Sequence, residues 1–329
     1  MSQRDSSAVR PRYDRETTAM EVVNGVDLRG RFIMITGGAG AGMGYEISRA
    51  LARTGAHIMI GARDRARGEE AARKIREESK NPDIEVGVMN LASLDSIKGF
   101  TENFLTRDQS IDVLIDHAGI AYLPQHTCTE DGFEAQFGTN YIGHFALTTD
   151  LTRALRANGG ARVIVVSSGG HRFTDIFWDD VNGHNRPYDA HEQYNQSKTA
   201  LCLFSVAFNR RYSPEGIFAN VMCPGGVYPT SLQVHMSSQD WMNYGLMDDA
   251  GRMSPMLKTP QQGAATQVWA AVSPELEGRG GLYLENCAIG EEHRPENPMV
   301  GYKPYALDPV AADRLWNMTE RWLAERGYR

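Results

Sequence analysis

Short apolar runs alternate along the chain with longer segments in which apolar residues recur at helical spacing. Continuous apolar runs are typical of strands buried on both faces of a sheet. Strands are expected at 32–35, 57–60, 84–89, 111–115, 163–166 and 218–222. Helical spacing predicts helices between them at 44–54, 67–79, 94–106, 133–156 and 194–212. This alternation predicts a single α/β domain with a doubly wound parallel sheet and helices on both faces.

Two segments fall outside the alternation. An N-terminal arm, 1–28, precedes the first strand and starts with polar and charged residues. A second segment, 228–262, is rich in Met, Pro, Gly and polar residues and follows the strand at 218–222. Ligands of open α/β sheets bind at the carboxyl ends of the strands. We therefore expect 29–329 to form the folded domain and 228–262 to cover its ligand as a lid.

Composition and charge narrow the classes of function. The 329 residues carry a net charge of −7, which argues against a nucleic-acid partner. No run reaches the roughly 20 apolar residues of a membrane span, and the polar N-terminus is unlike a signal peptide, so a cytoplasmic protein is expected. Scattered cysteines with no C-x-x-C pair predict neither a metal site nor a disulfide framework. These cysteines are Cys128, Cys202, Cys223 and Cys287.

A glycine-rich turn at 36–44 joins the first expected strand to the first helix. Glycine permits a tight turn whose backbone N–H groups approach a phosphate, and the following helix N-terminus favours negative charge. The turn therefore predicts a dinucleotide site, with a merely flexible turn as the alternative. Cofactor contacts are expected from Gly37, Gly38, Gly42, Met43 and Gly44.

The tip of the second strand bears on the choice of cofactor. A carboxylate there accepts a hydrogen bond from the ribose 2′-hydroxyl of NAD, whereas an arginine pairs with the 2′-phosphate of NADP. Gly61 and Ala62 offer no carboxylate, and Arg63 follows them. NADP(H) held by Arg63 is the expected cofactor. A surface ion pair between Arg63 and Asp64 is the alternative.

Tyr194 and Lys198 lie four positions apart and therefore share one face of the helix predicted at 194–212. An ammonium group beside a phenol favours the phenolate and lowers the tyrosine pKa. Such a pair can move a proton near neutral pH. The alternative is an amphipathic helix whose lysine extends to solvent.

Further motifs accompany this pair. They are Asp131-Gly132-Phe133-Glu134, the run 137–145, Val166-Ser167-Ser168, Pro224-Gly225 and the run 281–287. With them the chain resembles the short-chain dehydrogenase/reductase family, most closely its retinol dehydrogenase and WW-domain oxidoreductase-like branch. The likeness runs from Thr17 nearly to the end, and it implies a Rossmann-fold catalytic domain.

The resemblance implies a catalytic tetrad of Asn140, Ser168, Tyr194 and Lys198. Reduction of a carbonyl builds charge on its oxygen, which Ser168 would stabilise by a hydrogen bond while Tyr194 donates a proton. Lys198 would lower the tyrosine pKa, hold the nicotinamide ribose and connect to solvent through a water at Asn140. The structural alternatives are a helix kink at Asn140, a backbone-bonded hydroxyl at Ser168 and a solvated charge at Lys198.

The resemblance also implies cofactor contacts outside the glycine turn. They are expected from Asn90, Leu91, Ala118, Gly119, Tyr194, Lys198, Pro224, Gly225, Val227 and Thr230.

Several positions near the cofactor depart from the family pattern. The glycine turn has one extra residue, which predicts a bulge, and Asn90 stands where the family has an aspartate. Asp116 and His117 replace two asparagines, so a charged Asp116 would oppose phosphate binding unless it is paired. The segment 224–230 also contains an extra residue. Because of these departures, the sequence does not predict how tightly the cofactor binds.

The walls of the expected pocket are rich in aromatic and methionine side chains. One wall comes from the residues between Ser168 and Tyr194, and the other from 228–258. Such side chains suit a bulky apolar substrate, although an ordinary core is the alternative. His171 and His235 are within reach of the site, but lone histidines are more often core or surface residues.

Together these observations predict an oxidoreductase that transfers a hydride between NADP(H) and a hydrophobic alcohol, ketone or aldehyde, and so a ketoreductase in one direction. A non-redox enzyme of the same fold, such as an epimerase or cyclase, and a binding protein without turnover are the alternatives. The sequence specifies neither the substrate nor the physiological direction. The expected partner is a hydrophobic small molecule, with no nucleic acid and no membrane span, and a homodimer is left open.

Overall fold

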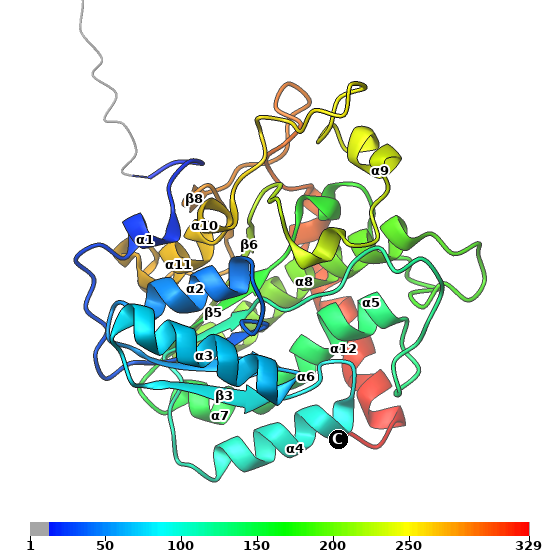
Figure 1. Ribbon diagram of the computed structural model, residues 1–329. Helices are drawn as coiled ribbons and strands as arrows, with labels where there is room; N and C mark the ends of the chain where they lie inside the picture. Colours follow the sequence, from blue (N-terminus) through cyan, green and yellow to red (C-terminus); the bar gives the residue numbers. More distant parts are fainter. Residues whose placement is uncertain (1–12, 329) are drawn as a thin grey trace, which may run out of the picture.

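Helices cover both faces of a single sheet in the computed structural model, which describes residues 13–328 (Figure 1). The strands follow the order β3-β2-β1-β4-β5-β6-β7-β8, and only β8 runs antiparallel to its neighbour. Their bounds are β1 Phe32–Thr36, β2 His57–Ala62, β3 Ile84–Val88, β4 Val113–Asp116, β5 Ala161–Val166, β6 Ile217–Cys223, β7 Tyr283–Glu285 and β8 Ala288–Ile289. The order reverses between β1 and β4, which is where ligands of this architecture bind. The predicted fold class is therefore confirmed.

The strands β1, β2, β4, β5 and β6 are buried over nearly their whole length, and their alternating side chains build two cores. Phe32 and Met34 of β1 pack with helices on one face, and Ile33 and Ile35 pack with those on the other. The helices of the first core are α4 Leu94–Leu105, α6 Gly143–Asp150, α7 Thr152–Arg156, α8 Ala190–Tyr212 and α12 Pro309–Glu325. Those of the second core are α1 Ala19–Val22, α2 Met43–Ala52, α3 Arg65–Ser79 and α11 Ala265–Val272.

Capping residues move the start of two predicted helices. α3 begins at Arg65 because the Asp64 carboxylate accepts a hydrogen bond from the Arg67 N–H at 3.1 Å. α8 begins at Ala190 because Asp189 caps it in the same way. Part of the predicted N-terminal arm forms α1, whose Ala19 and Val22 are buried, while residues 1–12 of that arm lie outside the described residues.

The single helix predicted at 133–156 is wrong. This stretch consists of α5 Ala135–Phe137, the π-helical turn η1 Gly138–Ile142, α6 and α7. A Cβ at Gly143 would collide with the Leu91 carbonyl, so glycine permits the close approach of the turn to the loop after β3. Apolar periodicity runs through the break, and the pattern alone therefore predicted one continuous helix.

The remaining elements are short and were not predicted. They are α9 Ser238–Asn243, α10 Pro260–Gly263 and the 3-10 turns η2 Gly169–Arg172, η3 Ser213–Glu215, η4 Ser231–Gln233, η5 Pro274–Leu276 and η6 Pro304–Leu307. Within residues 13–328, no helix combines the length and the apolar character needed to cross a bilayer.

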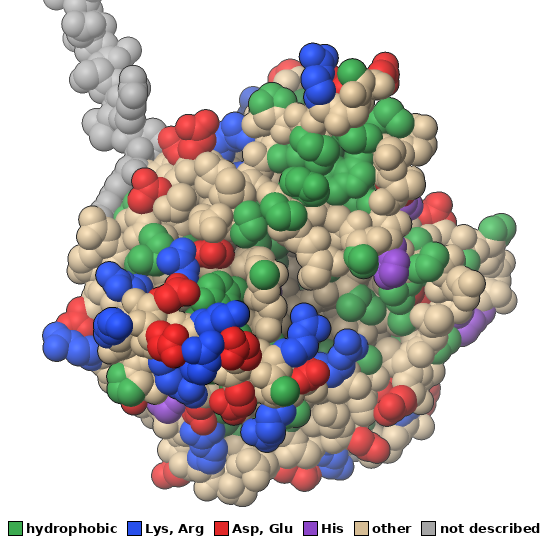
Figure 2. Space-filling view, in the orientation of Figure 1, with side chains coloured by type: hydrophobic (Ala, Val, Ile, Leu, Met, Phe, Trp, Pro, Cys, Tyr) green, Lys and Arg blue, Asp and Glu red, His purple; other side chains and the backbone are tan. Residues whose placement is uncertain are grey.

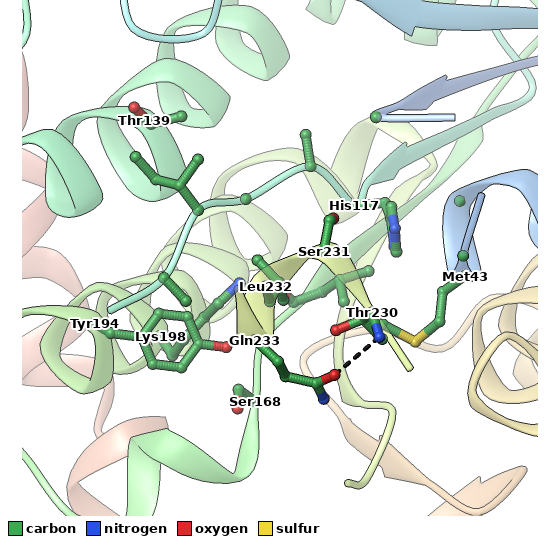
Figure 3. A pocket seen from close by; sticks show the side chains of 18 of the residues that line it. Met43, His117, Thr139, Ser168, Tyr194, Lys198, Thr230, Ser231, Leu232 and Gln233 are labelled. Atoms are coloured by element: carbon green, nitrogen blue, oxygen red, sulfur yellow. Dashed lines mark hydrogen bonds between the residues drawn. The ribbon is translucent and has the colours of Figure 1, made fainter. Parts of the chain in front are cut away.

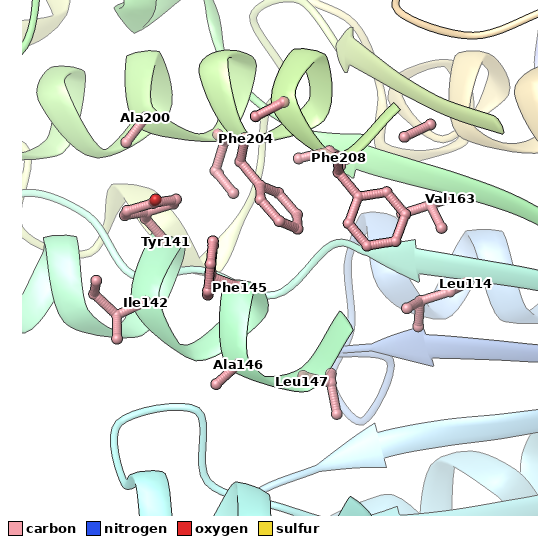
Figure 4. Close-up of a cluster of buried hydrophobic side chains, with 14 of the residues drawn as sticks. Leu114, Tyr141, Ile142, Phe145, Ala146, Leu147, Val163, Ala200, Phe204 and Phe208 are labelled. Atoms are coloured by element: carbon pink, nitrogen blue, oxygen red, sulfur yellow. The ribbon is translucent and has the colours of Figure 1, made fainter. Parts of the chain in front are cut away.

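Aromatic side chains join α6, α8 and α12 in the first core. Figure 4 shows Phe204 of α8 directed toward Phe145 of α6, and the centroids of these two rings lie 5.5 Å apart. Phe204 also stacks on Trp316 of α12, with ring centroids 6.2 Å apart and planes 12° from parallel. The helix that carries Tyr194 and Lys198 is thus fixed by aromatic packing on two sides.

We expect Phe204→Ala to lower the free energy of unfolding by ~3–5 kcal/mol, because it leaves a cavity among fully buried rings. Urea unfolding measures the change. Val310→Ala on α12 is the control, since Val310 is 76% exposed and should change stability by less than ~0.5 kcal/mol. Equal losses in the two variants would contradict the packing described.

Candidate active site

A cavity of about 690 Å³ opens at the carboxyl ends of β1, β2, β4, β5 and β6. Tyr194, Ser168 and Lys198 lie on one side of it and Met43 and His117 on the other, with η4 between them (Figure 3). The segment 228–262 borders the same cavity, and apolar side chains gather on its outer surface (Figure 2). The exposed ones include Tyr228, Val234, Met253 and Met256.

The glycine turn leaves backbone groups accessible at the start of α2. Gly37 has φ +83°, and a Cβ there would lie 2.9 Å from the Ala118 Cα. A Cβ at Gly44 would collide with the Gly37 carbonyl. Gly42 caps α2 without a side-chain hydrogen bond, so the first N–H groups of the helix have no side-chain acceptor from the cap. These features fit a bound pyrophosphate.

Nearly all of the predicted cofactor residues line the cavity. They are Gly37, Gly42, Met43, Gly44, Arg63, Asn90, Leu91, Ala118, Gly119, Tyr194, Lys198, Pro224, Gly225, Val227 and Thr230. Gly38 is the exception, because a side chain at this position would point toward β2 and α2 and away from the cavity. A Cβ there would lie 2.9 Å from both Ile60 Cγ2 and Ser48 Oγ.

Two arginines, Arg63 and Arg67, line the end of the cavity beside β2. The expected alternative, an ion pair between Arg63 and Asp64, is not formed, since the Asp64 carboxylate caps α3. Within the described residues, neither arginine has a carboxylate oxygen within 4.0 Å. Arg67 was not predicted from the sequence. The signal that could have found it is Asp64, a typical N-cap residue, which starts a helix directly after Arg63 and places Arg67 in its first turn.

Asp116 does not enter the cavity, contrary to expectation. Leu114 and Asp116 alternate onto the α6 face of the sheet, where the Asp116 carboxyl accepts a hydrogen bond from Thr148 Oγ1 at 2.7 Å. Burial raises the pKa of Asp116 to about 7, which favours its neutral form. His117 does line the cavity, and burial lowers its pKa to about 3. Among residues 13–328, its Nδ1 has no hydrogen-bond partner.

Tyr194 and Ser168 meet at the substrate end of the cavity. Burial raises the pKa of Tyr194, and the neighbouring Ser168 hydroxyl acts in the opposite direction. Lys198 Nζ lies 5.7 Å from the centroid of the Tyr194 ring, and burial outweighs the lowering of the tyrosine pKa that was expected from this lysine. The structure therefore holds a protonated phenol at neutral pH, a group able to donate a hydrogen bond.

Lys198 is buried, with 3% of its surface exposed, so it is not the solvated charge of the structural alternative. Its Nζ donates to the Val166 carbonyl at 3.1 Å. Burial lowers the pKa of Lys198 to about 8.

Asn140 lies behind the cavity in the π-helical turn rather than in its lining. Its Oδ1 accepts from the Ile120 N–H at 2.8 Å, while Nδ2 donates to the Ile120 carbonyl at 3.0 Å and to Ser197 Oγ at 2.9 Å. The helix kink that was the structural alternative at Asn140 is therefore present, and its link to solvent through a water stays a prediction.

Aromatic side chains surround Tyr194 at the substrate end. The ring of Tyr122 lies 4.8 Å from that of Tyr194, and Tyr244 meets Phe173 edge-on at 5.7 Å. All four side chains line the cavity. Tyr122 was missed, since nothing in the sequence marks it. Its positive φ of 57° belongs to the loop after β4.

The two histidines singled out from the sequence differ in position. His171 is buried outside the lining, with Nδ1 2.6 Å from the Ser168 carbonyl, which only accepts. His235 is exposed and lines the cavity from the segment 228–262. Among the pocket candidates of that segment, Met236 and Tyr244 line the cavity, whereas Trp241 is buried outside it.

Comparisons with known proteins agree with this site. The family described as short chain dehydrogenase matches residues 31–241. The human WW domain-containing oxidoreductase is 38% identical over 324 residues, which cover 96% of this chain and 74% of the relative. The short-chain dehydrogenase/reductase prx1 of Penicillium roqueforti is 32% identical, over 94% of this chain and 91% of its own.

Solved structures extend the likeness to three dimensions. A crystal structure from Mycobacterium paratuberculosis covers 94% of this chain and 98% of its own, with a TM-score of 0.69 and 28% identity. A gluconate 5-dehydrogenase from Burkholderia cenocepacia, solved with NADP and tartrate, covers 79% of this chain and 95% of its own. It has a TM-score of 0.59 and, at 22% identity, shows the fold alone.

The chain therefore belongs to the short-chain dehydrogenase/reductase family of oxidoreductases, whose members use nicotinamide cofactors. Within the family it belongs to the branch of the WW domain-containing oxidoreductases.

Burial of Lys198 predicts a defined pH dependence of stability. The ordinary lysine pKa is 10.5, and the folded value is about 8, so the unfolded chain binds more protons between these two values. Stability therefore rises with pH across this window, and the cost of burying the charge is fully present below about pH 8.

We expect the wild type to gain on the order of 3 kcal/mol relative to Lys198→Met between about pH 7 and about pH 10.5. Urea unfolding at several pH values measures the difference. Lys98→Met, at an exposed position of α4, is the control and should show no such gain. A pH-independent difference between wild type and Lys198→Met would contradict the assignment.

Proposed function

We propose that this protein transfers a hydride between NADP(H) and a hydrophobic alcohol, ketone or aldehyde. The observation that carries the proposal is one continuous cavity, with Arg63 and Arg67 at one end and Ser168 and Tyr194 among apolar side chains at the other. The bound cofactor supplies or accepts the hydride. Two arginines without carboxylate partners fit the 2′-phosphate that distinguishes NADP from NAD.

Tyr194 is the proposed proton donor to the substrate oxygen. Its phenol is protonated near neutral pH because burial raises its pKa, which suits the reducing direction. The Ser168 hydroxyl is proposed to hold the same oxygen by a hydrogen bond. Lys198 is proposed to bind the nicotinamide ribose, while Asn140 holds the loop at Ile120 and the helix at Ser197 in place.

The substrate class follows from the wall around Tyr194. Tyr122, Phe173 and Tyr244 present rings to the cavity, and Leu246 and Met236 extend the apolar surface. We propose that 29–329 is the catalytic domain and that 228–262 is a lid that removes a bulky apolar substrate from water. The cytoplasmic location and the homodimer stay predictions from the sequence.

The non-redox alternative rested on altered residues near the cofactor, above all Asp116. Because its carboxyl bonds to Thr148 behind the sheet, this residue gives no reason to expect a weakened cofactor site. The redox proposal is therefore the better supported of the two.

We expect NADPH to bind at least about tenfold more tightly than NADH. Arg63→Ala and Arg67→Ala should each narrow this preference by about 1–3 kcal/mol, the range of a charge-assisted hydrogen bond. Fluorescence titration with both nucleotides measures it. Arg65→Ala is the matched control, since this exposed arginine lies between the two but outside the cavity lining. Equal affinities of the wild type for NADPH and NADH would contradict the proposal that Arg63 and Arg67 bind the 2′-phosphate.

We expect Tyr194→Phe to slow turnover by about 10²–10⁴, because it removes the proposed proton donor while keeping the ring. NADPH affinity and the circular dichroism spectrum should stay unchanged. Single-turnover oxidation of NADPH with a panel of apolar ketones and aldehydes measures the chemical step. Tyr45→Phe is the control, because the Tyr45 hydroxyl donates to Glu78 and its side chain lies outside the cavity lining. Turnover of Tyr194→Phe within a few-fold of wild type would remove Tyr194 as the proton donor.

A further inference from the structure

The Thr36 hydroxyl, at the end of β1, joins the glycine turn to the loop after β4. Its Oγ1 accepts hydrogen bonds from the N–H groups of His117 and Ala118, each at 2.9 Å. Those two bonds use both lone pairs of a hydroxyl oxygen, so the Thr36 proton must be donated elsewhere. His144 Nε2 lies 2.9 Å away, and the Ile115 carbonyl lies at 3.4 Å, so the histidine is the better placed acceptor.

The other nitrogen of the His144 ring fixes its tautomer. Nδ1 lies 2.7 Å from the Asn140 carbonyl, and a carbonyl oxygen can only accept. Nδ1 therefore carries the proton, which leaves Nε2 free to accept from Thr36. Burial lowers the pKa of His144 to about 4, in agreement with a neutral ring.

A directed chain of hydrogen bonds then leads to the helix of the proposed proton donor. Thr36 donates to His144, and His144 donates to the Asn140 backbone. The Asn140 side chain donates to Ser197 Oγ at 2.9 Å, and Ser197 Oγ donates to the Tyr194 carbonyl at 2.7 Å. Every link is buried, so water competes little with these bonds.

We propose that His144 is a positioning residue that couples the glycine turn of the cofactor site to the helix carrying Tyr194. His144 touches neither cofactor nor substrate, since it lies outside the cavity lining. It holds Thr36 through Nε2 and the π-helical turn at Asn140 through Nδ1. The part of this inference that concerns the chemical step rests on the proposed function, whereas the part that concerns cofactor binding does not.

Three variants of His144 separate its two contacts. His144→Phe fills the space without either polar atom. His144→Asn keeps a donor near the position of Nδ1, and His144→Gln keeps an acceptor near the position of Nε2. Leu147→Ala is the matched control, because it perturbs the core side of the same helix without touching the chain of hydrogen bonds. Each variant is assayed for NADPH affinity, single-turnover rate and thermal unfolding.

We expect His144→Phe to weaken NADPH binding by about tenfold and to slow hydride transfer by about 10², the loss that a small misplacement causes. His144→Asn should recover the hydride-transfer rate but not the affinity, and His144→Gln should recover the affinity but not the rate. Leu147→Ala should lower the melting temperature with both functional values within about twofold of wild type. Should His144→Phe fail to fold, the Asn and Gln variants carry the same test.

Two results would overturn the inference. One is a folded His144→Phe with affinity and rate both within about twofold of wild type. The other is the same pattern of loss in the Asn and Gln variants, which would reduce His144 to a general stabilising residue. A wild type without turnover on any carbonyl substrate would overturn the proposed function instead, and the affinity measurements would still decide the role of His144 at the cofactor turn.

Discussion

Burial of the sheet on both faces is the constraint on which the site depends. The strands β1, β2, β4, β5 and β6 offer almost no surface to water, so polar chemistry gathers at the edge where the strands end. The glycine turn follows β1, Arg63 follows β2, and Ser168 follows β5. Parallel orientation brings these ends together although Ser168 is more than a hundred residues from the other two in the sequence. The cavity is thus a direct result of strand direction.

Continuous apolar runs and helical spacing made the strands β1 to β6 and most of the helices between them predictable. Strand positions, the glycine turn and the shared face of Tyr194 and Lys198 all follow from local pattern, because each depends on neighbours within a few residues. Asn140 and Ser168 were predicted as site residues only from the family resemblance. Long-range contacts, in contrast, decided what was missed. The π-helical turn depends on the approach of Gly143 to Leu91, and the position of Tyr122 at the cavity depends on how the loop after β4 folds.

The direction of the Asp116 side chain is set by the alternation of residues along β4 and not by its position in the family motif. Its position in the sequence suggested a charge beside the phosphates, yet alternation with Leu114 turns it to the α6 side. There it lies on the same face as Thr36 and His144, in a polar layer between the sheet and α6. Burial favours neutral forms of Asp116, His144 and Tyr194. The positive charges that line the cavity belong to Lys198 and to three arginines, Arg63, Arg67 and Arg172.

The π-helical turn at Gly138–Ile142 has a consequence for how this segment can change. A π turn contains one residue more than an α-helical turn, and each residue rotates the next side chain by about 100° around the axis. Deleting one residue would give a regular helix, but every side chain that follows would point in a new direction. Phe145 would leave the aromatic core, and His144 would leave Thr36. The packing of the residues after the turn therefore requires the π-helical geometry to be kept. Insertions and deletions should be far less tolerated here than in the surface loops.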